Sequence, residues 1–374
     1  MSEKKHIDYF DYIRVFAAIS VIYMHVAADP LRDVINWNWH AMNVLVCLGF
    51  TAVPLFFMMS GGLLLSNEKT LDVSVLLKKR LPRLIVPLIF WTIVALLWQA
   101  YLDQSFAGFF SGLLSSLNKP AWVHFWYMYT LIALYVISPV LYGGLQALDR
   151  KGHIFVFALA LLPTARTILL LLLPPSLEPL VNIDIINKLT FFGGHLSSFV
   201  LGYYLMNTKR RIPNALLLLC AATLLGIIIV GTYALTVRSG SFQQAFQNQS
   251  SGFEILLAAC LFLLAKQNLN RKSAVLQRIP VIPLSLSIYL MHGILLSWMD
   301  RTFEIVSFAD TLFYTFLNFI LCFAVTKTLA SIKPLCFPVT GLSYRDACKS
   351  CNWVFTWCAV RGRKKSSNEN VRLD

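Results

Sequence analysis

Three ionisable residues lie in the first apolar segment of the chain. Residues 10–28 read FDYIRVFAAISVIYMHVAA and include Asp11, Arg14 and His25. Each such group costs roughly 2.5–3.5 kcal/mol or more near the centre of a bilayer, so it usually marks a pathway or a site. On a helix, Arg14 and His25 would share one face and lie about 16 Å apart along the axis. That face would present a cation at one end and a proton acceptor at the other.

Each residue also has a plainer interpretation. Arg14 could extend to lipid phosphate, Asp11 could neutralise Arg14 at i, i+3, and a single histidine on an apolar face is often only packed. The presence of all three on one face favours a functional site. We expect Asp11 to hold Arg14 in place, with Arg14 near the inner boundary of the membrane and His25 in its outer half.

A second group of cations precedes the third apolar segment, in LLKKRLPRLIVP. Arg80 and Arg83, at i, i+3, can face the same way and clamp a phosphate with forked donors. The alternative is ordinary anchoring at the cytoplasmic side of a membrane, and composition alone favours that alternative. The density of charge permits a polyanionic cytoplasmic ligand.

Other stretches combine small, aromatic and imidazole side chains. Ser60 and Gly61 in FFMMSGGLLLS would let two helices pack closely or leave room for a substrate chain. Trp126 and Tyr129 fit an aromatic belt at the outer boundary, and they are also candidate contacts to the substrate. His292 is a further imidazole at membrane depth. Three polar residues receive no role from the sequence: Arg166, His195 and Glu254.

The elements that must position these residues are transmembrane helices. The 374-residue chain is 57% hydrophobic and only 13% charged, whereas a soluble domain is about a quarter charged. We predict an all-α, polytopic bundle of about ten helices and no cleaved signal peptide. The predicted segments are 9–28, 43–66, 84–102, 124–145, 153–174, 188–206, 213–236, 252–266, 281–299 and 309–332.

Loop charges predict the orientation of this bundle. Alternate connections are rich in Lys and Arg, and the others carry at most one cation each, so both termini are expected to be cytoplasmic. The net charge of +14 is then a property of cytoplasmic loops, and no nucleic-acid partner is expected. The cation-rich set is Lys4, Lys5, Lys69, Lys78, Lys79, Arg80, Arg83, Arg150, Lys151, Lys209, Arg210, Arg211, Lys266, Arg271, Lys272 and Arg278.

Residues from 333 onward read as a separate basic cytoplasmic tail of open role. Cys348 and Cys351 form a single C-x-x-C in this tail, which is a weak metal signal without a second pair. No metal is therefore expected.

Together these motifs resemble the acyltransferase-three family of integral membrane O-acyltransferases. The likeness is greatest to the branch that lacks a fused extracytoplasmic domain and acetylates surface polysaccharides such as enterobacterial common antigen. The matching stretches follow the family order: FDYIR with His25, VPLFFMMSGGLLL, KKRLPRLIVP, HFWYMYTLIALYVISPVL, FVLGYYL and SIYLMHG. Residues 1–332 would form the acyltransferase-three-like transmembrane domain.

The resemblance implies an acyl-CoA donor, most often acetyl-CoA, and a hydroxyl acceptor on an extracytoplasmic or lipid-linked glycan. By position, Arg14 and His25 match the essential pair of the family, and Arg80 and Arg83 match its CoA-binding R-x-x-R. The motif positions of less defined role are Asp11, Ser60, Gly61, Trp126 and Tyr129. The implied location is the inner membrane of a bacterial cell.

Two other classes remain open at this point. A transporter or flippase of a polysaccharide precursor would also have about ten helices with interior charges, but no inverted repeat is visible. A sensory or scaffold protein would act through the basic tail and would not need Arg14. The acceptor, the acyl group and the oligomeric state are not predicted.

Overall fold

The computed structural model describes residues 6–32, 35–180, 193–273, 276 and 281–350, and all regular structure in these ranges is helical. The N-terminal half contains α1 (Asp8–Val26), α2 (Trp37–Gly49), α3 (Ala52–Leu65), α4 (Val73–Val75), a π-helix (Leu76–Arg80), α5 (Pro82–Leu102), α6 (Phe109–Ser115) and α7 (Trp126–Ala147). The C-terminal half contains α8 (Arg150–Leu172), α10 (Gly193–Asn207), α11 (Asn214–Ser239), α12 (Gly252–Asn268), α14 (Val281–Thr302), α15 (Phe308–Ser331), α16 (Lys333–Thr340) and α17 (Tyr344–Ser350).

Membrane-spanning helices make up most of this bundle, as predicted. Among the described residues, seven helical stretches are long and apolar enough to cross a bilayer. Helices α1, α10 and α12 correspond to the other three predicted segments, with 19, 15 and 17 residues. The predicted residues 188–192 lie outside the described ranges. The chain is therefore a polytopic all-helical membrane protein, and the cytoplasmic placement of its termini stays a prediction.

The second predicted segment, 43–66, is divided between α2 and α3. Pro54 has no N–H to donate to the carbonyl of Phe50, so the helical hydrogen-bond ladder is interrupted there. The Thr51 hydroxyl instead donates to the Leu48 carbonyl at 2.6 Å. The two pieces still form one apolar stretch, Trp37–Leu65.

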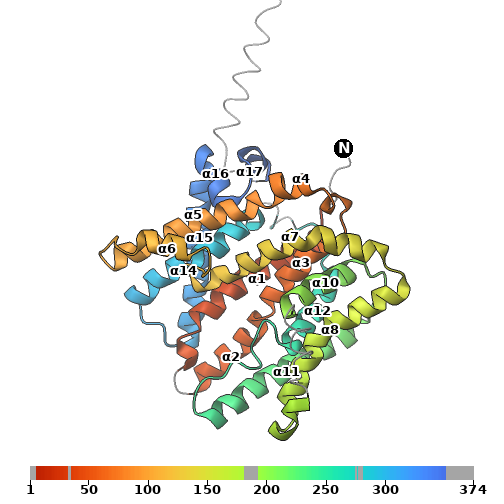
Figure 1. Ribbon diagram of the computed structural model, residues 1–374. Helices are drawn as coiled ribbons and strands as arrows, with labels where there is room; N and C mark the ends of the chain where they lie inside the picture. The colour runs from red at the N-terminus through yellow and green to blue at the C-terminus, as the bar shows by residue number, and fades with distance from the viewer. Residues whose placement is uncertain (1–5, 33–34, 181–192, 274–275, 277–280, 351–374) are drawn as a thin grey trace, which may run out of the picture.

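Helix α1 lies inside the bundle, where it contacts α2, α3, α12, α14 and α15 (Figure 1). Its Ala17, Val21 and Ile22 are buried in the main core. Large apolar side chains of the peripheral helices are exposed, among them Ile320 of α15 and Val140 of α7. In a bilayer such side chains face lipid, whereas α1 is surrounded by the five helices that it contacts.

Helices α3 and α10 cross at very close range. A Cβ added to Gly61 would lie 1.8 Å from the carbonyl oxygen of Phe199, and one added to Gly202 would lie 2.0 Å from that of Met58. Only glycine allows two backbones to approach this closely. The space at Gly61 is thus filled by the backbone of α10.

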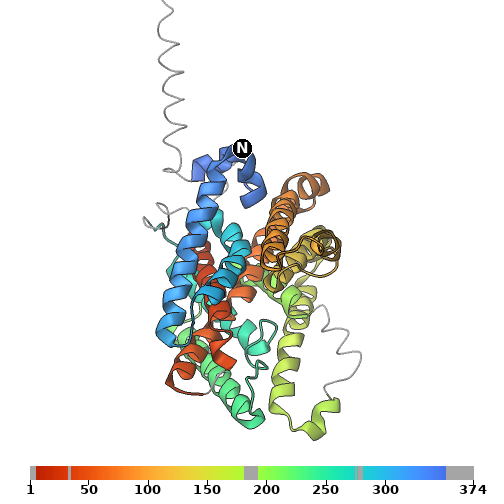
Figure 2. The ribbon, with the colours of Figure 1, turned by 90° about the vertical axis from the view of Figure 1, so that its left-hand side faces the viewer.

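The last two helices pack against one end of the bundle. Trp91 of α5 and Ser287 of α14 both donate to the carbonyl of Val339 in α16, at 3.2 and 2.8 Å. Figures 1 and 2 show α16 and α17 together at this end of the molecule, beyond the end of α15. Residues 333–350 are therefore folded onto the membrane domain.

Candidate active site

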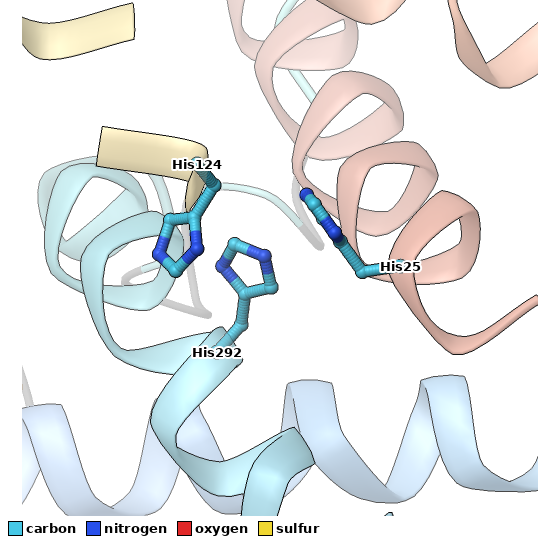
Figure 3. A group of neighbouring side chains, drawn as sticks. All are labelled: His25, His124 and His292. Atoms are coloured by element: carbon cyan, nitrogen blue, oxygen red, sulfur yellow. The ribbon is translucent and has the colours of Figure 1, made fainter. Parts of the chain in front are cut away.

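Three histidines from distant parts of the chain meet inside the bundle (Figure 3). His25 comes from α1, His124 from the 3-10 helix Val123–Phe125 before α7, and His292 from the middle of α14. The ring centroids of His124 and His292 are 4.2 Å apart, and His25 lies 5.1 Å from His292 and 5.7 Å from His124. We call these residues the histidine cluster.

Hydrogen bonds to backbone carbonyls hold two of the three rings. Nδ1 of His292 donates to the Tyr289 carbonyl at 2.5 Å, and Nε2 of His124 donates to the Leu290 carbonyl at 3.4 Å. Because a carbonyl only accepts, these nitrogens carry the protons, and the lone pairs are on His292 Nε2 and His124 Nδ1. Nε2 of His292 is buried and has no hydrogen-bond partner among the described residues.

Local structure around α14 makes room for this arrangement. A Cβ on Gly293 would lie 2.4 Å from Cε1 of His124 and 2.8 Å from Nε1 of Trp122. The Tyr289 hydroxyl donates to the His124 carbonyl, which ties the turn before α7 to α14. The glycine in SIYLMHG is therefore what allows His124 to lie against His292.

Arg14 lies toward the other end of the same face of α1. Its guanidinium is 3.6 Å from the carboxylate of Asp11, as the i, i+3 spacing predicts. Nε2 of His6 is 2.5 Å from the same carboxylate. Asp11 is buried and Arg14 is half-buried, so the pair is shielded from solvent and more strongly coupled than a surface pair.

Arg80 and Arg83 belong to the same region. Arg80, the last residue of the π-helix, donates to the Thr70 hydroxyl at 2.8 Å. Arg83 forms an ion pair with Asp346 of α17 at 3.6 Å, and both side chains are about half exposed. The partly buried Tyr135 on α7 interacts electrostatically through its phenol with Arg14, Arg80 and Arg83. These three guanidiniums around Tyr135 are called the arginine end of the site.

The remaining predicted residues lie between these two groups or beside them. Ser60 of α3 interacts with the phenol of Tyr127, which also interacts electrostatically with Arg14. The ring of Trp126 packs on that of His195 at 5.0 Å. Tyr129 donates its hydroxyl proton to the Ser116 carbonyl. Their proposed ligand contacts stay predictions.

Two polar residues without a predicted role are His195, which contacts Trp126, and Glu254 of α12. His195 packs on Phe57 at 5.0 Å and its Nε2 is 3.5 Å from the Ser250 hydroxyl. Glu254 is fully buried, and neither carboxylate oxygen has a hydrogen-bond partner among the described residues. An unpaired charge at such a buried position would be costly.

Sequence reasoning missed His124 and Tyr135 as members of the site. Both occur in the stretch HFWYMYTLIALYVISP, eleven residues apart. This is the spacing that places Arg14 and His25 on one face of α1, and it was a usable signal that α7 runs alongside the same site. Because only one catalytic imidazole was expected, the spacing of His124 and Tyr135 was not interpreted in this way.

Fold and geometry together define a membrane protein with an imidazole group and a guanidinium group toward opposite ends of one face of α1. A family model described as an acyltransferase domain matches residues 7–327, and the chain belongs to this acyltransferase-three family. No curated protein and no solved structure matches the chain. The matched range includes both ends of the site and stops before α16. Membership of this family makes the chain a multi-pass membrane acyltransferase.

Proposed function

We propose that the protein transfers an acyl group from acyl-CoA, with acetyl-CoA as the donor, to a hydroxyl of an extracytoplasmic or lipid-linked glycan in the bacterial inner membrane. The observation that carries this proposal is the pairing along α1. One face presents Arg14, a member of the arginine end, and His25, a member of the histidine cluster. A donor with phosphates at one end and a thioester at the other fits such a site.

The arginine end would bind the phosphates of CoA. Guanidinium groups bind phosphate through two parallel hydrogen bonds, and Arg80 and Arg83 are close enough in sequence to share one ligand. Arg14 would hold the inner end of the donor and Asp11 would fix Arg14. An extended pantetheine arm would then span the roughly 16 Å of helix between Arg14 and His25.

His25 would act as the general base. One ring nitrogen takes the proton from the acceptor hydroxyl while that oxygen attacks the thioester carbonyl. The carbon–sulfur bond then breaks, and the proton passes from the imidazolium to the leaving thiolate, which gives the ester and free CoA. A transient acyl-imidazole on His25 is the alternative covalent route. Trp126, Tyr129 and His292 are the proposed contacts to the acceptor.

Replacement of His25 tests the chemistry directly. Membranes containing His25→Gln protein should transfer less than about 1% of the wild-type amount of radiolabelled acetyl from acetyl-CoA to surface glycan, because a general base contributes about 10²–10⁴-fold to the rate. His40→Gln changes an exposed histidine on α2 and is the matched control. The amount of each protein in the membrane is measured by immunoblot. Wild-type transfer by the His25→Gln protein would remove His25 from the reaction.

A further inference from the structure

We propose that the histidine cluster binds one transition-metal ion of the zinc type. A potential ligand atom from each of His25, His124 and His292 lies within 4.8 Å of the other two. Figure 3 shows the ring of His292 between those of His124 and His25, and the three imidazoles come from three different elements. Such a set matches the three-histidine sites in which zinc keeps a fourth position open.

The hydrogen bonds of the cluster are those of metal ligands. A histidine that binds a metal usually donates its second ring N–H to a carboxylate or a backbone carbonyl, which fixes the tautomer and the direction of the lone pair. His292 and His124 both have such a bond, to Tyr289 and Leu290. The remaining nitrogen of His292 is fully buried and unpartnered, which is unfavourable unless something binds it.

The distances require only a modest adjustment. Zinc–nitrogen bonds of 2.0–2.1 Å in a tetrahedron place ligand nitrogens about 3.3 Å apart, so the most distant pair must approach by about 1.5 Å. His25 can make this movement, because it is only half-buried and no hydrogen bond within the described ranges holds its ring.

The donor set selects the kind of metal. Neutral imidazole nitrogen suits zinc, copper, nickel and cobalt, whereas magnesium and calcium require oxygen ligands. The cluster contains three imidazoles and no carboxylate. Zinc is the probe of choice, and cobalt is its spectroscopic substitute.

Metal binding and general-base catalysis exclude one another at His25. The ion would occupy the lone pair that takes the acceptor proton, so zinc binding should inhibit acyl transfer. This consequence rests on the proposed function. Binding itself does not, and the two are measured separately.

The binding experiment uses the purified full-length protein in detergent after treatment with EDTA. We expect one zinc per chain after dialysis against micromolar zinc, and a visible absorption band of tetrahedral cobalt on titration with cobalt. His124→Ala and His292→Ala should each weaken zinc binding by 100-fold or more. His153→Ala, which removes a histidine of α8 outside the cluster, should leave it unchanged.

Melting temperature with and without zinc keeps the test informative if a variant folds poorly. A ligand that binds only the folded state raises this temperature, so wild-type protein should be stabilised by zinc and not by magnesium. Less than 0.1 zinc per chain in wild-type protein, or equal binding by wild type and both cluster variants, would overturn the site.

The activity experiment addresses the consequence for catalysis. Saturating zinc should reduce acetyl transfer by wild-type membranes at least tenfold, and EDTA should restore it. Activation by zinc would overturn the claim that a bound metal prevents His25 from acting as the base. The result of the binding experiment would still stand. Loss of acetyl transfer under every condition, with one zinc still bound, would overturn the proposed function alone.

Discussion

A single buried imidazole is an ordinary packing residue, but the surroundings of His25 are unusual. Two other imidazoles approach it, and the lone pair of His292 at Nε2 has no partner within the described structure. Burial of Nε2 without a hydrogen-bond partner is energetically unfavourable. This arrangement favours a functional cluster, in which the histidines either transfer a proton or bind a metal ion.

Gly293 offers a sharp test of the cluster without removing a histidine. Gly293→Ala places a methyl group 2.4 Å from Cε1 of His124, so the ring must move. We expect at least a tenfold loss of acetyl transfer and, from overpacking, a loss of about 1–3 kcal/mol in stability. Acetylation of glycan and the thermal midpoint of the purified protein provide the two measurements.

Gly226→Ala is the control for this substitution. Gly226 is in α11 and an added Cβ there has nothing within 4 Å, so the alanine should be neutral or slightly stabilising. If Gly293→Ala keeps normal activity and a normal midpoint, the position of His124 is not needed for the reaction.

The sequence predicts contacts between residues that are close in the chain, and it predicts contacts between distant residues poorly. The pairing of Arg14 with Asp11 follows from helix periodicity alone, and the structure confirms it. His124 joins His292 from 168 residues away, through a close approach that only the folded bundle creates. The spacing of His124 and Tyr135 could place α7 beside the site, but no local pattern shows that His124 contacts His292. The prediction of no metal was made without that contact.

Among the elements, α1 is the axis of the site because its neighbours approach it from several sides. It contacts α14, which supplies His292, while α7 supplies Tyr135 to the arginine end and follows the turn with His124. The division of α2 from α3 could be read from Pro54, but the predicted single segment missed it. The crossing of α3 and α10 at Gly61 was foreseen as one of two alternatives.

The segment around the π-helix provides a prediction at this scale. The double variant Arg80→Gln/Arg83→Gln should raise KM for acetyl-CoA by about tenfold or more, with a smaller change in kcat. Loss of one charge-assisted hydrogen bond, roughly 1.5–3 kcal/mol, is sufficient for such a change. The measurement is the initial rate of acetyl transfer at increasing acetyl-CoA concentration.

Lys78→Gln/Lys79→Gln is the matched control, because it removes two charges from the same segment at exposed positions. Its KM should rise less than about threefold if the arginines bind phosphate directly, since exposed charges act only through a screened field. Equal increases in the two double variants would return Arg80 and Arg83 to the role of membrane anchors.

At the scale of the whole molecule, the family domain and the folded unit end at different places. The family match stops at residue 327, whereas α16 and α17 continue onto the bundle. The sequence predicted a separate basic tail from residue 333. The hydrogen bonds to Val339 and the approach of Gly341 to the Arg83 carbonyl, 2.2 Å from an added Cβ, show that 333–350 is packed beside the arginine end.

This packing predicts the effect of shortening the chain. A protein ending at Ile332 leaves Trp91 and Ser287 without their acceptor and exposes the surface that Cys336 and Val339 cover. Burial of each such apolar side chain contributes about 1.5–3 kcal/mol, so the thermal midpoint should fall clearly. KM for acetyl-CoA should rise as well, because the backbone at Arg83 loses its contact with Gly341.

The variant Asp346→Asn separates the effect on stability from the effect on KM. It breaks the half-exposed ion pair to Arg83, worth about 0–1 kcal/mol, so the midpoint should fall much less than in the shortened protein. The KM of this variant for acetyl-CoA should fall by at most a few-fold, because the guanidinium of Arg83 is then free of its carboxylate partner and available to the phosphates. A protein ending at Ile332 that keeps both its midpoint and its KM would show that α16 and α17 do not support the donor end of the site.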